Sequence, residues 1–142
     1  MSRSGYSEDG CDDQWADIRW RGAVKAALRG KRGQAFLRDF IAALDAMPVK
    51  RLAASAWVKG EDACALGVVA RARGFEAFIE TLDPDDDIGA EMIAPVLNIA
   101  PAMAREIIFT NDDAAGYWNV SPENRWAYMR RWAESQLRKD AP

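Results

Sequence analysis

The segment from Arg51 to Gly74 most constrains the fold, because it is the most apolar part of the chain and lies between segments of opposite charge. Within it, the four residues from Lys59 to Asp62 are polar and include a glycine, which is typical of a tight turn. This pattern predicts a short hairpin with Leu52–Val58 and Asp62–Leu66 as its arms, followed by a helix that ends at Gly74. We expect the rest of the chain to pack around this segment.

Amphipathic periodicity predicts helices on both sides of the central segment. The clearest helix covers residues 34–47 and is stopped by Pro48. Further helical patterns cover residues 15–29, 75–82, 88–97 and 101–110, and a last one opens at Ser121-Pro122-Glu123. The sequence therefore predicts a mainly α fold, a compact single-domain bundle of five or six helices with at most one small β-hairpin. This domain spans residues 14–142 and follows a flexible N-terminal arm of residues 1–13.

Two groups of turn-forming residues are predicted to separate helices. Gly30 and Gly33 bracket Lys31 and Arg32, a pattern that indicates a turn carrying two cations. Farther along the chain, the run Asn111-Asp112-Asp113, followed by Gly116, is expected to end a helix.

Composition indicates one hydrophobic core and a cytoplasmic protein. The 142 residues are 49% hydrophobic, which is sufficient for one core. Five tryptophans lie at spacings typical of buried stripes: Trp15, Trp20, Trp57, Trp126 and Trp132. No segment approaches the roughly 20 apolar residues of a membrane span, and the polar, acidic N-terminus is unlike a signal peptide. Cys64 is predicted to be a buried core residue and Cys11 a free thiol.

Charge is segregated along the chain despite a net charge of −3. Residues 19–38, the basic segment, contain seven cations and no acid, whereas residues 76–91, the acidic segment, contain seven acids and no cation. The two segments either attract partners or neutralise each other inside the fold, and the sequence leaves both interpretations open.

The residues that most enzymes and metal sites need are absent or badly spaced. The chain has no histidine, the commonest general base and metal ligand at neutral pH. A calcium loop starting at Asp83 requires glycine and glutamate where the chain has Ile88 and Ala94. We therefore expect no enzymatic activity, no cofactor and no metal site.

Two features resemble nucleic-acid-binding elements. Arg29, Lys31 and Arg32 are cations that can contact phosphates by charge alone. The helical pair at residues 88–110 resembles a helix-turn-helix in length and turn, but its second helix offers only Arg105 and Glu106 to read bases. A plain helical hairpin in the core is the simpler interpretation of this pair.

Tyr117 and Trp118 are the best candidates for an exposed aromatic anchor. They lie in the polar loop between Asn111 and Val120, before the predicted last helix. Exposed tyrosine and tryptophan are enriched at the centres of protein interfaces. The predicted partner-binding residues are therefore Arg29, Lys31, Arg32, Tyr117 and Trp118.

Segments along nearly the whole chain resemble a group of small uncharacterised proteins of phages and prophages of proteobacteria. These segments are MSRSGYS, WADIRWRGAV, RGKRGQAFLRDF, CALG, AREIIFTND and SPENRWAYMRRW. The resemblance implies a phage accessory protein acting in the bacterial cytoplasm. We expect a non-enzymatic interaction protein that binds a host or phage protein complex, such as an inhibitor of a bacterial defence system of anti-CRISPR or anti-restriction type. The alternative is a small nucleic-acid-binding or regulatory protein using residues 19–38 or 88–110. Neither hypothesis specifies an oligomeric state.

Overall fold

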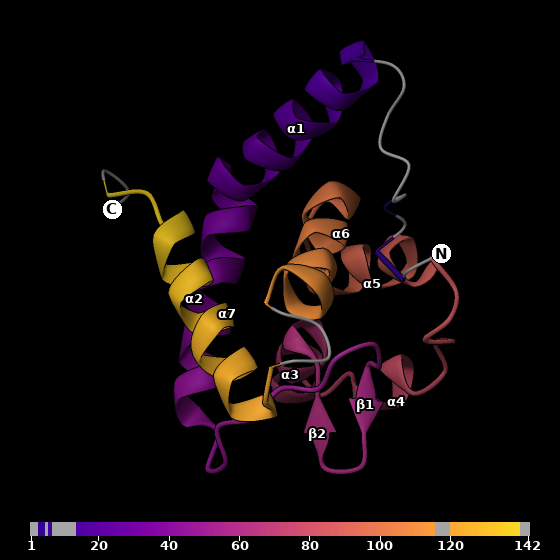
Figure 1. Ribbon diagram of the computed structural model, residues 1–142, viewed down its shortest axis with the longest axis vertical. Helices are drawn as coiled ribbons and strands as arrows, with labels where there is room; N and C mark the ends of the chain where they lie inside the picture. The colour runs from indigo at the N-terminus through magenta and orange to yellow at the C-terminus, as the bar shows by residue number, and fades with distance from the viewer. Residues whose placement is uncertain (1–2, 5, 7–13, 116–119, 140–142) are drawn as a thin grey trace.

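The computed structural model describes residues 3–4, 6, 14–115 and 120–139. This part of the chain contains seven α-helices, one short π-helix and one two-stranded antiparallel sheet (Figure 1). The elements are α1 (Gln14–Arg29), α2 (Lys31–Ala46), β1 (Val58–Lys59), β2 (Asp62–Ala63), α3 (Ala65–Ala72), α4 (Glu76–Ile79), α5 (Gly89–Leu97), α6 (Pro101–Phe109), the π-helix η1 (Thr110–Ala114) and α7 (Pro122–Gln136). The predicted mainly helical, single-domain fold with one small hairpin is confirmed, with seven α-helices in the described residues where five or six were predicted.

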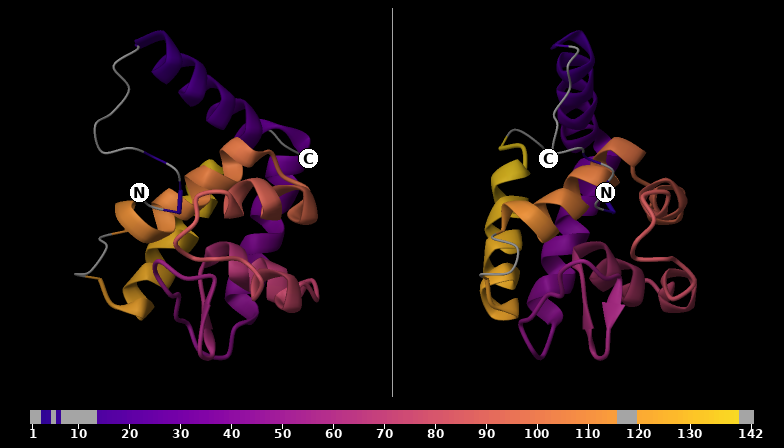
Figure 2. Two further views of the ribbon diagram at one scale, coloured as in Figure 1. Left: turned by 90° about the vertical axis from the view of Figure 1, so that its right-hand side faces the viewer. Right: turned by 45° about the vertical axis from the view of Figure 1, so that its right-hand side comes forward.

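Two helices organise the packing of the others. Helix α2 contacts α1, α3 and α7, while α6 contacts α1, α3, α5 and η1. Helix α1 bridges the two groups, and its N-terminal end projects beyond the rest of the fold in all three views (Figures 1 and 2). The first turns of α1 therefore have fewer neighbours than its C-terminal half.

The central segment folds as its pattern predicts. Val58 pairs with Ala63 and Lys59 with Asp62, and Gly60 adopts the positive φ of +63° that the tight turn requires. Helix α3 follows directly, and Gly74 ends this region with a φ of +84°. The strands are shorter than the predicted arms. In the predicted first arm the Leu52 amide donates to the Pro122 carbonyl over 3.0 Å and the Ser55 amide donates to Asp112, so neither pairs across the hairpin.

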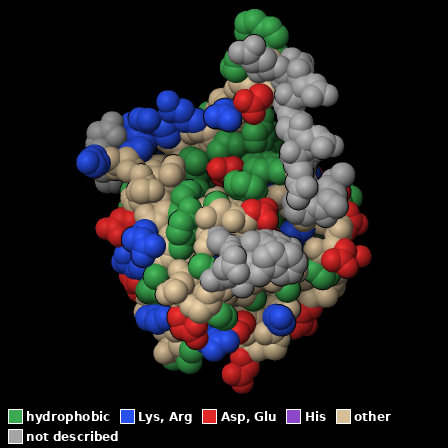
Figure 3. Space-filling view, viewed as in Figure 1, with side chains coloured by type: hydrophobic (Ala, Val, Ile, Leu, Met, Phe, Trp, Pro, Cys, Tyr) green, Lys and Arg blue, Asp and Glu red, His purple; other side chains and the backbone are tan. Residues whose placement is uncertain are grey.

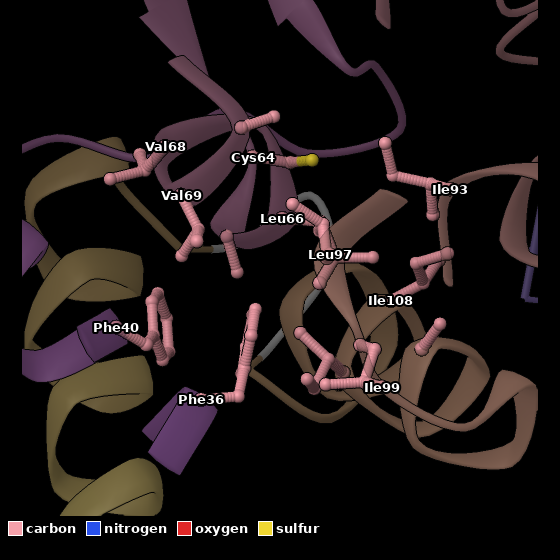
Figure 4. Packing of buried hydrophobic residues seen from close by; sticks show 14 of the residues in the cluster. Phe36, Phe40, Cys64, Leu66, Val68, Val69, Ile93, Leu97, Ile99 and Ile108 are labelled. Carbon is pink, nitrogen blue, oxygen red and sulfur yellow. The ribbon is translucent and has the colours of Figure 1, made fainter. Parts of the chain in front are cut away.

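The core joins the apolar faces of α2, α3, α5 and α6. Figure 4 shows Phe36 and Phe40 of α2 near Val69 of α3, and Leu66 near Leu97 of α5. All five side chains are buried. Helix α2 shows the i, i+3, i+4 spacing that the sequence predicted, and this spacing places its apolar face on the core.

The tryptophans in the described residues divide into three environments. Trp57 is buried as predicted, and Trp20, Trp126 and Trp132 are partly buried against the core. The prediction for Trp15 is wrong, because its side chain is 70% exposed in the projecting first turn of α1. A helical stripe alone does not reveal that the helix extends past its neighbours.

The connection between α1 and α2 is shorter than predicted. Helix α2 begins at Lys31, so Lys31 and Arg32 form its first turn and not a connecting loop. Gly33 is buried, and a Cβ atom there would lie 1.9 Å from the carbonyl oxygen of Ala27. This glycine therefore permits the close approach of α1 to α2 and does not mark a turn.

The helix predicted over residues 101–110 matches α6 (Pro101–Phe109), but the run Asn111-Asp112-Asp113 is not the turn that was expected after it. It continues α6 as the π-helix η1, in which Asn111 and Asp112 are buried. Both side chains form long-range hydrogen bonds within the fold, so these buried polar groups have partners without contact with water. The last helix does begin as predicted, since the Ser121 hydroxyl accepts the Asn124 amide over 3.1 Å.

Among the described residues, no helix taken singly is apolar over a length that would cross a membrane. Helix α5 and residues Pro101–Ala114 meet that test of length and composition only when joined across a bend of 115°. Both contribute buried residues to the core.

Cys64 is buried, as predicted, and also caps α3. Its sulfur accepts the Gly67 amide over 3.4 Å and lies 3.5 Å from a guanidinium nitrogen of Arg3. Only 1% of the residue is exposed. Reagents in solution therefore reach this thiol only after the surrounding core opens.

We expect the Cys11→Ser variant, which retains Cys64 alone, to react with Ellman's reagent only at the rate of unfolding. Denaturant should release one thiol per chain. The control is Cys64→Ala, in which Cys11 is predicted to react quickly; Cys11 lies outside the described residues. Fast labelling of native Cys11→Ser protein would show that the α3 cap opens without unfolding.

Candidate functional site

A groove of about 650 Å³ lies between α1, α6 and the C-terminal end of α7. Figure 3 shows Lys and Arg side chains gathered over α1 and the end of α7, beside a hollow with hydrophobic side chains. The lining contains five cations and one carboxylate. We call it the basic groove; its residues are Trp20, Arg21, Val24, Lys25, Leu28, Arg29, Glu106, Ser135, Gln136, Leu137, Arg138 and Lys139.

One wall of the basic groove is a row of cations on α1. Arg21, Lys25 and Arg29 follow one another at intervals of four residues and are exposed. Residues four apart lie on one helical face, separated by about 6 Å along the axis. Arg21 also pairs with Asp17 over 3.0 Å, but 79% of its side chain is exposed, so the pair holds it weakly.

The buried side chain of Gln34 fixes the opposite wall. Its Nε2 donates to the carbonyl oxygens of Leu28 (2.8 Å) and Gln136 (3.0 Å), and its Oε1 accepts the Arg138 amide over 2.8 Å. This one amide joins the C-terminal ends of α1 and α7. Arg138 completes the link by donating from its guanidinium to the Arg29 carbonyl over 3.4 Å.

Apolar residues and a carboxylate form the base of the basic groove. Val24 and Leu28 are buried there, while Trp20 and Leu137 are only partly buried. Glu106 accepts the Tyr6 hydroxyl over 2.8 Å. Burial and this bond to a carboxylate both raise the pKa of Tyr6, so the phenol stays protonated and remains the donor.

Tyr6 also packs against Trp20, the aromatic residue that lines the basic groove. Its ring lies edge-on to Trp20 at 5.3 Å between centroids and contacts Phe109 at 5.0 Å. Arg3 and Ser4 are buried nearby in the chain. The prediction of a loose N-terminal arm is therefore corrected at these three positions, while the remainder of residues 1–13 lies outside the described residues.

A second polar cluster, the Arg3–Asp112 cluster, lies inside the fold. The Arg3 guanidinium donates to both oxygens of Asp112 over 2.7 and 2.9 Å, and both side chains are at most 4% exposed. Asp112 Oδ1 also accepts the Ser55 amide over 3.0 Å and the Asn111 side-chain amide over 2.8 Å. Burial acts to raise the pKa of Asp112, but the bonds and charge of Arg3 outweigh it and hold the pKa below its usual range.

The Arg3–Asp112 cluster connects three distant parts of the chain. Asn111 donates to the Ala53 carbonyl over 2.9 Å and accepts the Ala65 amide over 3.2 Å, while Arg125 of α7 donates to the Asn111 carbonyl over 2.8 Å. The guanidinium of Arg3 lies 4.7 Å from the Trp57 ring centroid. Because the cluster is enclosed and internally bonded, its role is to hold the fold together.

The structure assigns different places to the predicted site residues. Arg29 lines the basic groove. Lys31 and Arg32 are exposed at the start of α2 and do not line it; Arg32 donates to the Asn98 side chain over 3.4 Å. Tyr117 and Trp118 lie outside the described residues.

Sequence reasoning missed the contribution of Arg21, Lys25, Arg138 and Lys139 to a shared site. The spacing of four residues on α1 was a usable signal for the first two. Nothing local in the sequence indicates that residues 138 and 139 lie beside residue 29, because Gln34 makes that connection through the fold.

The helical pair at residues 88–110 forms a core hairpin. Met103, Ala104, Ile107 and Ile108 of α6 are buried, which leaves this helix little surface to place in a DNA groove. Arg105 is occupied by Glu91 over 3.0 Å and by two backbone carbonyls.

The acidic segment has cationic neighbours from outside the basic segment. Glu76 pairs with Arg71 over 2.8 Å and Glu91 pairs with Arg105. Within the described ranges, His, Cys, Asp and Glu side chains form no group of three or more that is placed to hold a metal ion.

Comparisons with protein-family models, with curated proteins and with solved structures gave no match. The chemistry of the basic groove is therefore the best indication of function.

Proposed function

We propose that this chain is a non-enzymatic interaction protein that binds an acidic surface of a protein partner through the basic groove. The observation that carries the proposal is the meeting of cations from α1 with cations that follow α7. Arg29 and Arg138, for example, are 109 residues apart in sequence and are joined at the groove. Arginine beside partly exposed apolar residues is a composition that protein interfaces favour.

Stabilisation of the helix ends accounts for only some of the cations that line the basic groove. Arg29 ends α1, and Arg138 and Lys139 follow α7, so each complements the negative end of a helix dipole. Arg21 and Lys25 lie in the interior of α1 and have no such role. Their alignment with Arg29 on one face is better explained by an anionic ligand in the groove.

The resemblance to phage and prophage proteins suggests the setting of the proposed interaction. The partner in this proposal is a host or phage protein complex in the bacterial cytoplasm, and inhibition of a defence system of anti-CRISPR or anti-restriction type is the corresponding role. Tyr117 and Trp118 remain proposed contacts of the same partner.

Two triple variants from the basic segment test the proposal. We expect R21E/K25E/R29E to lose at least 90% of the partner captured from a lysate of a phage-bearing host, because it reverses one wall of the basic groove. The control K31E/R32E/R38E makes the same change of charge on residues that do not line the groove. Its capture should stay within twofold of wild type, with mass spectrometry as the readout.

Equal capture by both variants and the wild type would exclude the groove as the binding site. Retention on DNA-cellulose tests the nucleic-acid alternative in parallel, because phosphate binding falls steeply with salt. Retention that both triple variants abolish would favour nucleic acid bound by the basic segment as a whole.

A further inference from the structure

The spacing of charge in the basic groove defines the kind of polypeptide that fits it. Arg21, Lys25 and Arg29 recur every four residues, so their attachment points repeat about every 6 Å along α1. Acidic side chains on a second helix repeat at the same interval when they too are four residues apart. A helix lying along α1 would therefore bring one carboxylate to each cation.

The opposite wall adds charge at one end only. Arg138 donates to the Arg29 carbonyl over 3.4 Å, and Lys139 lines the groove next to it in sequence. The positive charge of the groove is thus densest where α1 and α7 end. A partner with its acids concentrated towards one end matches this gradient.

The apolar lining requires more than charge from the partner. Val24 and Leu28 of the lining are buried, whereas Trp20 and Leu137 keep part of their side chains exposed. A large apolar side chain on the facing helix would cover them and exclude water from the neighbouring ion pairs. A purely polar acidic chain has no side chain that could make this contact.

Two features disfavour nucleic acid in the same groove. Glu106 places a carboxylate at the base of the groove, which would repel a backbone that carries a phosphate at every nucleotide, whereas an amphipathic helix can place an apolar side chain there. The chain as a whole carries a net charge of −3, which opposes the approach of a long polyanion but matters less for a short acidic helix.

We infer that the basic groove receives an acidic amphipathic α-helix of a partner protein, with carboxylates at intervals of four residues and large apolar side chains on the adjacent face. This inference rests on the proposed function and specifies the partner's binding element. Recognition follows the helix-in-groove mode, in which apolar anchors give affinity and flanking charges set orientation.

Three fluorescein-labelled probes test the inference by fluorescence anisotropy. The first is a 16-residue helical peptide with glutamates every four residues and leucines on the adjacent face. The second replaces each leucine with glutamine at equal charge, and the third is a 20-residue oligothymidylate. We expect the first peptide to bind at least tenfold more tightly than the second, and R21E/K25E/R29E to weaken it by at least 100-fold. The control K31E/R32E/R38E should change its affinity less than threefold.

The outcomes separate this inference from the proposed function. Equal binding of the two peptides, or tighter binding of the oligothymidylate, would overturn the inference while leaving the groove as an anion-binding site. If neither peptide nor oligothymidylate binds and R21E/K25E/R29E captures the same lysate proteins as the wild type, both the inference and the proposed function fail. If none of the probes binds but lysate capture still depends on the groove, the inference alone fails.

Discussion

Replacing Asp112 with asparagine is expected to lower the free energy of unfolding by about 3–5 kcal/mol, the usual cost of removing one partner from a buried ion pair. The carboxylate accepts four hydrogen bonds, two of them from the Arg3 guanidinium. Asparagine directs an NH₂ group at one of these donors and leaves the Arg3 charge uncompensated inside the fold. At roughly 3 °C per kcal/mol for a chain of this length, the melting temperature should fall by about 9–15 °C.

The same substitution should change how stability depends on pH. The pKa of Asp112 is depressed in the folded state, so its contribution is fully present above the unfolded value of about 3.9 and is lost as the pH falls through the lower folded value. The difference in stability between wild type and Asp112→Asn should therefore be constant near neutral pH and shrink below about pH 4. Urea unfolding at a series of pH values measures this difference.

Two further variants show whether the loss belongs to the ion pair. Asp85→Asn removes an exposed carboxylate and should change stability by less than about 0.5 kcal/mol. In an Arg3→Met background, where the cation that pairs with Asp112 is absent, Asp112→Asn should cost at least about 2 kcal/mol less than in the wild type. Equal costs in the two backgrounds would mean that Asp112 acts through Ser55 and Asn111 and not through Arg3.

The Arg3–Asp112 cluster also illustrates what sequence reasoning could not predict. The pattern of polar residues around Asp112 indicated a helix end, because aspartate and asparagine favour turns when no distant partner is considered. Arg3 lies 109 residues away, in a segment whose composition indicated a loose arm. Neither position carries a local signal of the pairing, so the sequence pattern does not predict that η1 continues α6.

Elements determined by local pattern were predicted well. The apolar face of α2, the Ser121 cap of α7 and the hairpin turn at Gly60 each follow from spacing or turn chemistry within a few residues. Trp15 failed because burial of a helical stripe depends on whether other elements reach it, which periodicity does not contain.

The basic groove was predicted only in part. The sequence supplies the charge of residues 19–38 and therefore the expectation that Arg29 contacts a partner. Which cations act together depends on the bond network of Gln34, a buried polar residue that the sequence does not distinguish from the other residues of α2. Lys31 and Arg32, adjacent to Arg29 in sequence, consequently fall outside the groove, while Arg138 and Lys139 fall inside it.

Gly33 provides the second large expected effect, because the contact between α1 and α2 leaves no space for a side chain. In Gly33→Ala the new Cβ would lie 1.9 Å from the Ala27 carbonyl oxygen and 3.0 Å from that of Leu28. These are backbone atoms of a helix, so they cannot move aside as a flexible side chain would. We expect the free energy of unfolding to fall by about 2–3 kcal/mol, in the range found for overpacked cores, even though alanine is the better helix former.

The same change at Gly22 is the matched control. This glycine lies in the interior of α1, and a Cβ there meets nothing within 4 Å. Gly22→Ala should therefore raise stability by about 0.5–1 kcal/mol through helix propensity alone. Thermal unfolding followed by circular dichroism should show shifts of opposite sign, about −6 to −9 °C at position 33 and about +1.5 to +3 °C at position 22. If Gly33→Ala is as stable as the wild type, α1 and α2 are not held at the close distance that also sets the position of Arg29 in the basic groove.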